Sequence, residues 1–222
     1  MCQNVCDSGE STDNIKEWDR KHDSSVKRDI ILDAAEQVFS DKDYHEAVLD
    51  EVADVAGVSK ATLYLYFKNK IDLFLSVAER KLCELNEVIL KSTADCSDPV
   101  ATIKRLITDE LTFFSDNAAF FKVIHDQRFN LQLRAQVNED EIRERVMPLM
   151  FSKINVTAEV IKLGQENGVF QAVNPKEAAF MLTSLVHTCL LLLNLAPEDV
   201  VLTDKAELVE KIFLEGLLMR KT

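Results

Sequence analysis

Apolar residues recur with helical spacing along most of the chain, and the pattern begins near Ser24. The first three segments are a helix expected over 24–40, a short second helix over 49–56 and a short third helix over 60–66. Gly57 gives a stop signal after the second helix, and Ser59 can cap the third. The apolar positions that define the first two helices are Ile30, Ile31, Ala34, Ala35, Val38, Phe39, Leu49, Val52, Ala53 and Ala56.

The remainder of the chain carries the spacing and the boundary signals of further helices. Polar caps and prolines, which favour the first turn of a helix, mark most of these boundaries. The signals predict helices that start at Asn69, at Asp98-Pro99, near 117 and at Asn174-Pro175, a long helical region that Pro148 divides and that ends near Asn167-Gly168, and a last helix capped by Thr203. No segment alternates like a β-strand, so the sequence predicts an all-α fold of about nine helices.

The two C-terminal helices carry more apolar surface than a solvent-facing helix needs. Residues 178–196 form a nineteen-residue run without Lys, Arg, Asp or Glu, nearly long enough to cross a membrane. Polar residues such as His187 and Asn194 interrupt this run, and no basic or aromatic flank anchors it, so we expect no membrane span. The helices at 175–195 and 203–219 are instead candidates for a homodimer interface. The residues expected on the buried side of the last helix are Val209, Ile212, Phe213, Gly216 and Leu217.

Composition and charge narrow the class of protein. With 5 Gly and 4 Pro in 222 residues, the chain is neither collagen-like nor of low complexity. The net charge is −12, so any contact with nucleic acid requires a local basic surface. Residues 1–23 are polar and lack the apolar core of a signal peptide, so a mobile N-terminal tail is expected there.

The cysteines predict neither a disulfide framework nor a zinc site. The chain has five of them, an odd number, and no C-x-x-C motif. No group of residues has the spacing of metal ligands, so we expect no metal and no cofactor. A reducing cytoplasm is the simplest setting for this protein, and a redox switch at Cys2 and Cys6 is an alternative role for the tail.

Residues 48–67 have the pattern of a helix-turn-helix, in which a tight turn at Gly57 separates two short helices. In such motifs the second helix enters the major groove of DNA. Charge is distributed to match: residues 24–70 hold six basic and nine acidic residues, whereas 57–71 hold three lysines and no acid. Phosphates attract such a lysine-bearing tip, so the motif predicts DNA binding. The residues suited to the buried face of the second helix are Val58, Leu63 and Phe67.

Residues 26–75, and above all GVSKATLYLYFKNKIDLF at 57–74, resemble the N-terminal DNA-binding domain of TetR/AcrR-type transcriptional regulators. The family pattern runs approximately A-G-V-S-x-G-T-x-Y-x-Y-F-x-x-K-x-x-L. This chain matches it at Ala56, Gly57, Val58, Ser59, Thr62, Tyr64, Tyr66, Phe67, Lys70 and Leu73. The resemblance covers about a quarter of the chain. It implies a DNA-binding domain at 24–70 and a helical effector-binding and dimerisation domain at 71–222.

The resemblance also implies which residues contact double-stranded DNA, largely at its phosphates. They are Ser59, Lys60, Thr62, Tyr64, Tyr66 and Lys70. Four positions depart from the family pattern. Asp43 stands where a Gly often ends the first helix. Ala61 replaces the usual Gly, and Ala47 and Val48 stand where a Thr or Ser often caps the second helix and binds a phosphate.

Residues 98–222 hold nine of the twelve phenylalanines, which suits either a plain packed core or an apolar cavity. The resemblance implies that a small-molecule effector binds there. The candidate effector-binding residues are Phe113, Phe114, Phe121, His125, Phe129, Phe151 and His187. For each of them, packing in the core is the alternative interpretation.

These features together predict a ligand-responsive DNA-binding regulator, and we expect a repressor that a largely apolar molecule releases from a palindromic operator. A symmetric homodimer would present two recognition helices about 34 Å, or a multiple of it, apart. A protein-binding adaptor of the same fold, without operator binding, is one alternative. An enzyme that uses the apolar pocket is another, although no G-x-S-x-G, H-E-x-x-H or Gly-rich phosphate loop occurs, so we expect no enzyme.

Overall fold

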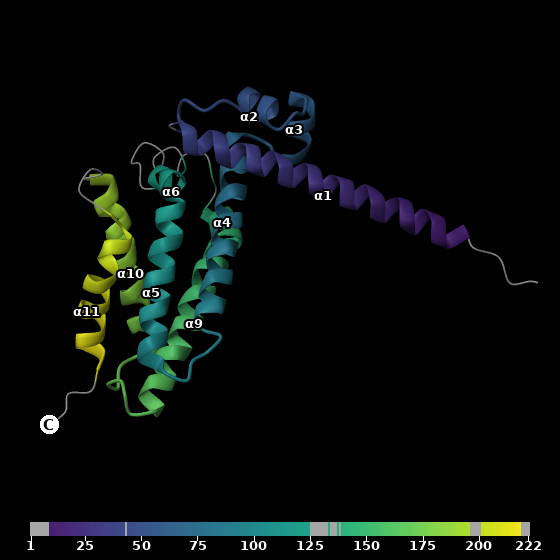
Figure 1. The fold of residues 1–222 in the computed structure, drawn as a ribbon. Coiled ribbons are helices and arrows are strands. Elements are labelled where there is room, and N and C mark those ends of the chain that lie inside the picture. Colours follow the sequence, from purple (N-terminus) through teal and green to yellow (C-terminus); the bar gives the residue numbers. More distant parts are fainter. Residues whose placement is uncertain are drawn as a thin grey trace, which may run out of the picture.

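The computed structural model describes residues 9–42, 44–124, 133, 137, 139–195 and 201–218. Within these ranges the chain forms ten α-helices and one short 3₁₀ helix, without a β-strand, which confirms the predicted all-α fold. The helices are α1 (Gly9–Asp41), α2 (Leu49–Val55), α3 (Lys60–Tyr66), α4 (Lys70–Ser92), α5 (Pro99–Asp116), α6 (Ala118–Ile124), α8 (Glu139–Arg145), α9 (Met147–Glu166), α10 (Pro175–Leu195) and α11 (Ala206–Leu217), with the 3₁₀ helix η1 (Thr203–Lys205) before α11 (Figure 1).

The N-terminal domain packs α1, α2 and α3 around the first turns of α4. At its centre, the ring of Phe74 lies 5.3 Å from that of Phe39 and 5.2 Å from that of Tyr44, measured between ring centroids. All three rings are buried, and burial raises the pKa of Tyr44 to about 12. Phe74 also stacks on Phe120 of α6 at 5.0 Å. The same α4 side chain therefore belongs to the cores of both domains.

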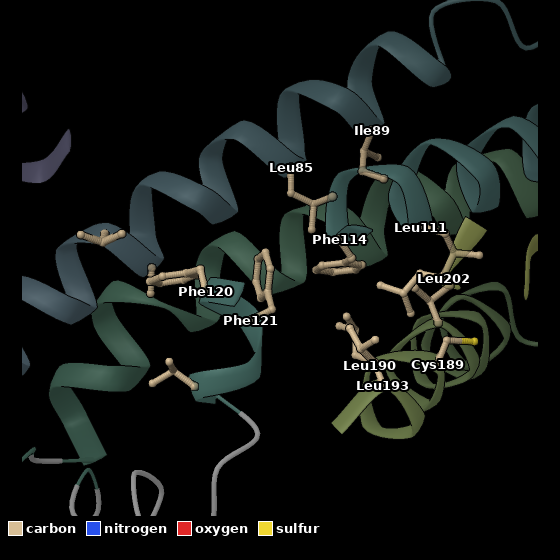
Figure 2. Packing of buried hydrophobic residues seen from close by; sticks show 14 of the residues in the cluster. Leu85, Ile89, Leu111, Phe114, Phe120, Phe121, Cys189, Leu190, Leu193 and Leu202 are labelled. Carbon is tan, nitrogen blue, oxygen red and sulfur yellow. The ribbon is translucent and has the colours of Figure 1, made fainter. Parts of the chain in front are cut away.

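The C-terminal domain is a bundle in which α4, α5, α9, α10 and α11 lie alongside one another (Figure 1). Figure 2 shows its interior, where the rings of Phe114 and Phe121 meet edge to face with centroids 4.8 Å apart, near Leu190 of α10. Helix α10 is long and apolar enough to cross a membrane by length and composition alone. It packs against α9, α5, α6 and α11, and 33% of its apolar window Pro175–Leu193 is buried there.

The predicted helix starts are largely confirmed by the caps in the structure. The Asn69 side chain accepts a hydrogen bond from the Asp72 backbone N–H at 2.8 Å where α4 begins. The Asp98 carboxylate accepts from two backbone N–H groups in the first turn of α5, at 2.9 and 3.1 Å. Pro148 is the second residue of α9 and follows the break that separates α9 from α8, as predicted. These caps satisfy N–H groups that a helix cannot pair internally.

Helix α1 starts earlier than predicted. It begins at Gly9 and so includes most of the segment expected to be a tail over 1–23. Residues 10–41 contain neither proline nor glycine and are rich in Glu, Lys and Arg, which favour helix, so the packed part of α1 can extend toward the N-terminus. Figure 1 shows this end of α1 projecting beyond the other helices.

The last helix also differs from the prediction. Thr203 does not cap it; Thr203 opens η1, and α11 begins at Ala206 without a side-chain cap. Ile212 is 53% exposed and Gly216 is exposed, although both were expected on the buried side. The expected residues that are buried are Val209, Phe213 and Leu217. A second stripe of α11 therefore remains open to solvent beside α10.

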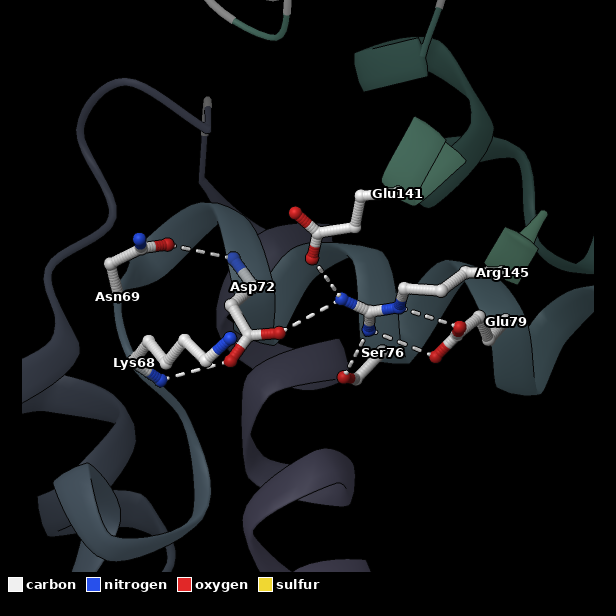
Figure 3. Close-up of polar contacts among 7 residues, drawn as sticks. All are labelled: Lys68, Asn69, Asp72, Ser76, Glu79, Glu141 and Arg145. Atoms are coloured by element: carbon white, nitrogen blue, oxygen red, sulfur yellow. Dashed lines mark hydrogen bonds and ion pairs between the residues drawn. The ribbon is translucent and has the colours of Figure 1, made fainter. Parts of the chain in front are cut away.

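Arg145, at the end of α8, joins the C-terminal domain to the first turns of α4 (Figure 3). Its Nε and Nη2 donate to the two carboxylate oxygens of Glu79 at 2.7 and 3.0 Å. Its Nη1 donates to Asp72 and Glu141, both at 2.9 Å, and Nη2 donates to the Ser76 hydroxyl at 2.9 Å. The hydrogen bonds to Glu79 raise the pKa of the guanidinium. Because each of its five N–H groups has an acceptor, the side chain is held in one orientation.

The carboxylate of Asp72 extends this network into the N-terminal domain. Its second oxygen accepts a hydrogen bond from the backbone N–H of Lys68 at 2.9 Å (Figure 3). Lys68 lies two residues beyond the end of α3. One acidic side chain therefore connects the end of α3 to α8.

We expect R145M to lower the free energy of unfolding by about 2 kcal/mol, because it leaves three carboxylates without their common partner. The Arg145 side chain is 22% exposed, so water screens part of the resulting repulsion. Urea unfolding followed by far-ultraviolet circular dichroism measures the change. R143M is the matched control on the same helix: Arg143 is 71% exposed and pairs with Asp140 at 3.2 Å, so a loss under about 0.5 kcal/mol is expected. Equal losses in the two variants would contradict the role given to Arg145.

Candidate functional site

The turn between α2 and α3 is built on Gly57, whose φ of 64° lies in the left-handed region that favours glycine. The Gly57 N–H donates to the Asp54 carbonyl at 3.1 Å, and the Val58 N–H donates to the Ala53 carbonyl at 2.9 Å. These bonds close the end of α2 and direct the chain into α3. The predicted helix-turn-helix is therefore present in the structure.

Helix α3 begins with the predicted Ser59 cap. The Ser59 Oγ accepts a hydrogen bond from the Thr62 backbone N–H at 3.1 Å and lies 2.8 Å from the Thr62 Oγ1. At the other end, Leu63 and Phe67 are buried, with 0% and 2% of their surface exposed. The cap and the two apolar anchors fix which face of α3 points away from the domain.

The outward face of α3 carries lysine, tyrosine and an unexpected leucine. Leu65 is 83% exposed and Tyr64 is 52% exposed. The exposed residues of this face are Lys60, Ala61, Tyr64, Leu65 and, just beyond the helix, Lys68. The resemblance implied no DNA contact for Ala61, Leu65 or Lys68, although helical spacing from Lys60 and Tyr64 places Ala61 and Leu65 on the same side. An exposed leucine here suits contact with the methyl group of thymine in the major groove.

The other predicted DNA contacts lie at the rim of this face. Thr62 and Tyr66 are half-buried, and Tyr66 packs against the core. The Lys70 ammonium lies over the ring of Tyr44, 4.3 Å from its centroid, in the first turn of α4. Ser59, Lys60 and Tyr64 are the exposed members of the predicted set. Three of the six predicted residues are therefore exposed, and the other three are partly enclosed.

Two features of α2 bear on this surface. Lys60 forms an ion pair with Asp50 of α2, and the two side chains are 58% and 56% exposed. Val48 occupies the N-cap position of α2 and makes no side-chain cap bond, as its departure from the family pattern predicted. The surface therefore lacks a hydroxyl at the start of α2, and one of its lysines, Lys60, is already paired with the carboxylate of Asp50.

The C-terminal domain encloses a cavity of about 400 Å³ between α4, α5, α6, α8, α9 and α10. Most of its lining is aliphatic or aromatic. The polar lining residues are Asn86, Lys153, Thr183 and His187. In the described part of the chain, no three His, Cys, Asp or Glu side chains are placed to hold a metal ion. The cavity therefore suits an apolar molecule with a small number of polar contacts.

Three of the predicted effector residues, Phe114, Phe121 and His187, line this cavity. The His187 ring lies 6.0 Å from that of Phe114. Phe113 packs beside Phe121 at 6.1 Å without lining the cavity, and Phe151 is 43% exposed, 6.4 Å from the ring of Phe180. The predicted residues His125 and Phe129 lie outside the described residues. The sequence interpretation missed Asn86 and Lys153, because single polar residues on α4 and α9 give no distinctive spacing.

The structure is thus that of a two-domain helix-turn-helix protein, in which an exposed α3 is joined through α4 to a helical domain with an apolar cavity. Comparison with known proteins agrees. Residues 31–77 match the family described as bacterial regulatory proteins, tetR family. The similarity to this family therefore covers the helix-turn-helix and the first turns of α4.

Several relatives are similar over about half of the chain. The chain is 31% identical over 113 residues to the HTH-type transcriptional activator FasR of Mycolicibacterium smegmatis, covering 50% of this chain and 52% of FasR. It is 32% identical over 114 residues to the fatty acid metabolism regulator protein of Bacillus subtilis, covering 49% of this chain and 57% of that protein. These alignments span about half the length of the relatives.

A solved structure matches most of the chain. The fatty acid degradation regulator FadR from Bacillus halodurans superposes with a TM-score of 0.70 at 25% identity, covering 87% of this chain and 97% of FadR. The likeness includes both the helix-turn-helix domain and the helical C-terminal domain, as the resemblance predicted.

We expect D50N to tighten binding to operator DNA by about two- to fivefold, because it removes a carboxylate that competes with phosphate for Lys60. Fluorescence anisotropy with labelled duplex at fixed salt measures the change. D54N is the control, since Asp54 is also an exposed acid of α2. If D50N and D54N shift affinity equally, the effect is one of net charge and the Lys60 pair is not the cause.

Proposed function

We propose that this protein is a ligand-responsive transcriptional repressor that acts in the cytoplasm as a homodimer. One copy of α3 from each subunit enters the major groove of a palindromic operator. The observation that carries the proposal is the exposed face of α3, where Lys60, Tyr64 and Lys68 project from a segment, 57–71, that contains no acid. An acidic chain with a basic tip binds duplex DNA through that tip and repels it elsewhere.

The effector is an apolar small molecule that binds in the cavity of the C-terminal domain. The lining of Phe, Leu, Ile and Met side chains supports this. Two of the similar proteins are named for the metabolism or degradation of fatty acids, which supports an effector with an aliphatic chain.

Helix α4 provides the connection between effector and DNA. Phe74, Leu75 and Ala78 line the cavity, and Asp72, less than two turns before them, accepts a hydrogen bond from the Lys68 backbone N–H just beyond α3. An effector that prefers a shifted position of α4 therefore changes the spacing of the two recognition helices. A preference of roughly 2–3 kcal/mol for that state lowers operator affinity about 30- to 150-fold.

The homodimer is supported by an open apolar face on α10 and α11. Phe180, Met181 and Ile212 are 50%, 66% and 53% exposed. Met181 and Ile212 border one groove between α10 and α11, which Ala178 and Gly216 also line. A surface of this kind marks an interface, and an isologous pair buries it twice.

Electrophoretic mobility shift on the DNA that flanks the gene tests operator binding. We expect the double variant K60A/Y64A to lose detectable binding, because it removes a phosphate contact and an exposed ring from the same face. The variant should remain dimeric by sedimentation velocity. K91A, which removes an exposed lysine from the far end of α4, is the control and should bind like the parent. Unchanged binding by K60A/Y64A would contradict the assignment of this surface.

A protein-binding adaptor of the same fold is the second candidate. It is favoured by Val48 at the N-cap of α2, because a hydroxyl that could bind phosphate is missing there. Salt titration separates the two functions. A DNA binder shows a steep negative slope of log affinity against log salt, whereas an adaptor that binds through apolar contacts does not.

We expect M181K to convert the dimer to a monomer, since it places a charge in the centre of the apolar face. Sedimentation velocity gives the oligomeric state, and circular dichroism checks that the helices remain. L90K is the control: Leu90 is 58% exposed on α4, outside the groove between α10 and α11. A dimer that survives M181K would exclude this face as the interface.

A further inference from the structure

A buried ion pair meets the effector cavity and has no part in DNA binding. It joins Lys153 of α9 to Glu110 of α5, whose side chains are 8% and 4% exposed. Lys153 lines the cavity, whereas Glu110 lies outside the lining. Removing two charges from water is unfavourable, and apolar side chains of similar size would pack there as well or better. The position of the pair at a cavity wall points to a ligand.

Two hydrogen-bond donors on this wall are unused. The Lys153 ammonium has three N–H groups, and Glu110 is its one hydrogen-bond partner in the described part of the chain. Thr183 of α10 lines the same cavity and is 9% exposed, and its hydroxyl makes no hydrogen bond to the residues described. Asn86 differs, because its side-chain amide already donates to the Leu149 carbonyl at 3.0 Å. Buried donors without partners are unfavourable unless a ligand supplies an acceptor.

These polar groups lie toward the end of the cavity that is farther from the DNA-binding domain. Helices α4 and α9 run away from that domain, and Asn86 and Lys153 come late among the lining residues of each (Figure 1). Helix α10 runs back toward it, and Thr183 is its first lining residue. The near end is lined by apolar side chains that include Phe74 and Ile142. The cavity therefore has an apolar body and a polar end.

We infer that the effector is an uncharged amphiphile whose hydrogen-bond-accepting head, such as an amide or ester carbonyl, binds Lys153 and Thr183. This inference rests on the proposed ligand-responsive function and specifies the ligand. The ion pair is neutral as a whole, so a carboxylate head would place a second negative charge beside Glu110, and an amine head would lie against Lys153. A neutral acceptor uses both donors without changing the buried charge.

Displacement of the fluorescent apolar dye N-phenylnaphthylamine from the full chain, without DNA, tests the head group. Decanamide and methyl decanoate are expected to displace the dye at concentrations about tenfold lower than decanoate or decylamine at neutral pH. T183V should weaken decanamide about fivefold, the effect expected for one lost hydrogen bond. T112V is the matched control, because Thr112 is exposed on α5 and its hydroxyl bonds to the Thr108 carbonyl.

A second variant removes the ion pair without leaving a lone charge. K153M/E110M replaces both side chains by apolar ones of similar length, which keeps the core folded. It should weaken decanamide about tenfold and bind the dye as the parent does. Tighter binding of decanoate or decylamine, or unchanged decanamide affinity in T183V and K153M/E110M, would overturn the inference.

The result is independent of operator binding. A protein that prefers decanamide but never binds DNA would contradict the regulator and support the head-group inference. A protein that decanoate releases from its operator in preference to decanamide would support the regulator and contradict the head-group inference.

Discussion

The fixed position of the first turns of α4 is the constraint on which both domains depend. Phe74 lies in the aromatic core of the N-terminal domain and stacks on Phe120 of the C-terminal domain. Apolar contact of this kind holds the two domains together but does not fix their relative orientation, because the hydrophobic effect is non-directional. Direction comes from Arg145, whose guanidinium holds Asp72 and Glu79 of α4 with every N–H engaged. A molecule that displaces α8 or α9 must therefore break directional bonds, which favours two discrete arrangements over a continuous range.

Much of the fold follows from local signals in the sequence. The caps at Asn69 and Asp98 and the break before Pro148 were predictable because the bonds that define them span at most three or four residues. Thr203 shows the limit of this reasoning, because a capping residue can equally open a 3₁₀ turn. The start of α1 was missed because a polar segment without apolar periodicity gives no signal that separates helix from tail.

The candidate site was predictable only in part, and for the same reason. The tip of α3 lies within one continuous motif, so the Ser59 cap and the outward position of Lys60 and Tyr64 followed from spacing, whereas their contact with DNA is implied by the resemblance alone. The cavity gathers residues from six helices, and the Lys153–Glu110 pair joins positions 43 residues apart. Arg145 and Glu79 are 66 residues apart. Contacts over such distances depend on how helices pack, which residue spacing along one helix does not reveal. Phe151 illustrates the converse, since an aromatic residue near the cavity in sequence is 43% exposed.

The exposed apolar stripe along α10 and α11 links the cellular concentration of this protein to its resistance to degradation. Folding and pairing become one equilibrium when a subunit alone leaves such a surface wet, so resistance to unfolding rises with concentration. A chain present in few copies then spends more time in the form that proteases recognise. Synthesis of the protein above a threshold concentration would therefore protect the folded protein from proteolysis. A concentration below that threshold would speed its degradation. In the proposed homodimer, the concentration of the protein therefore sets how much of it stays folded and protected.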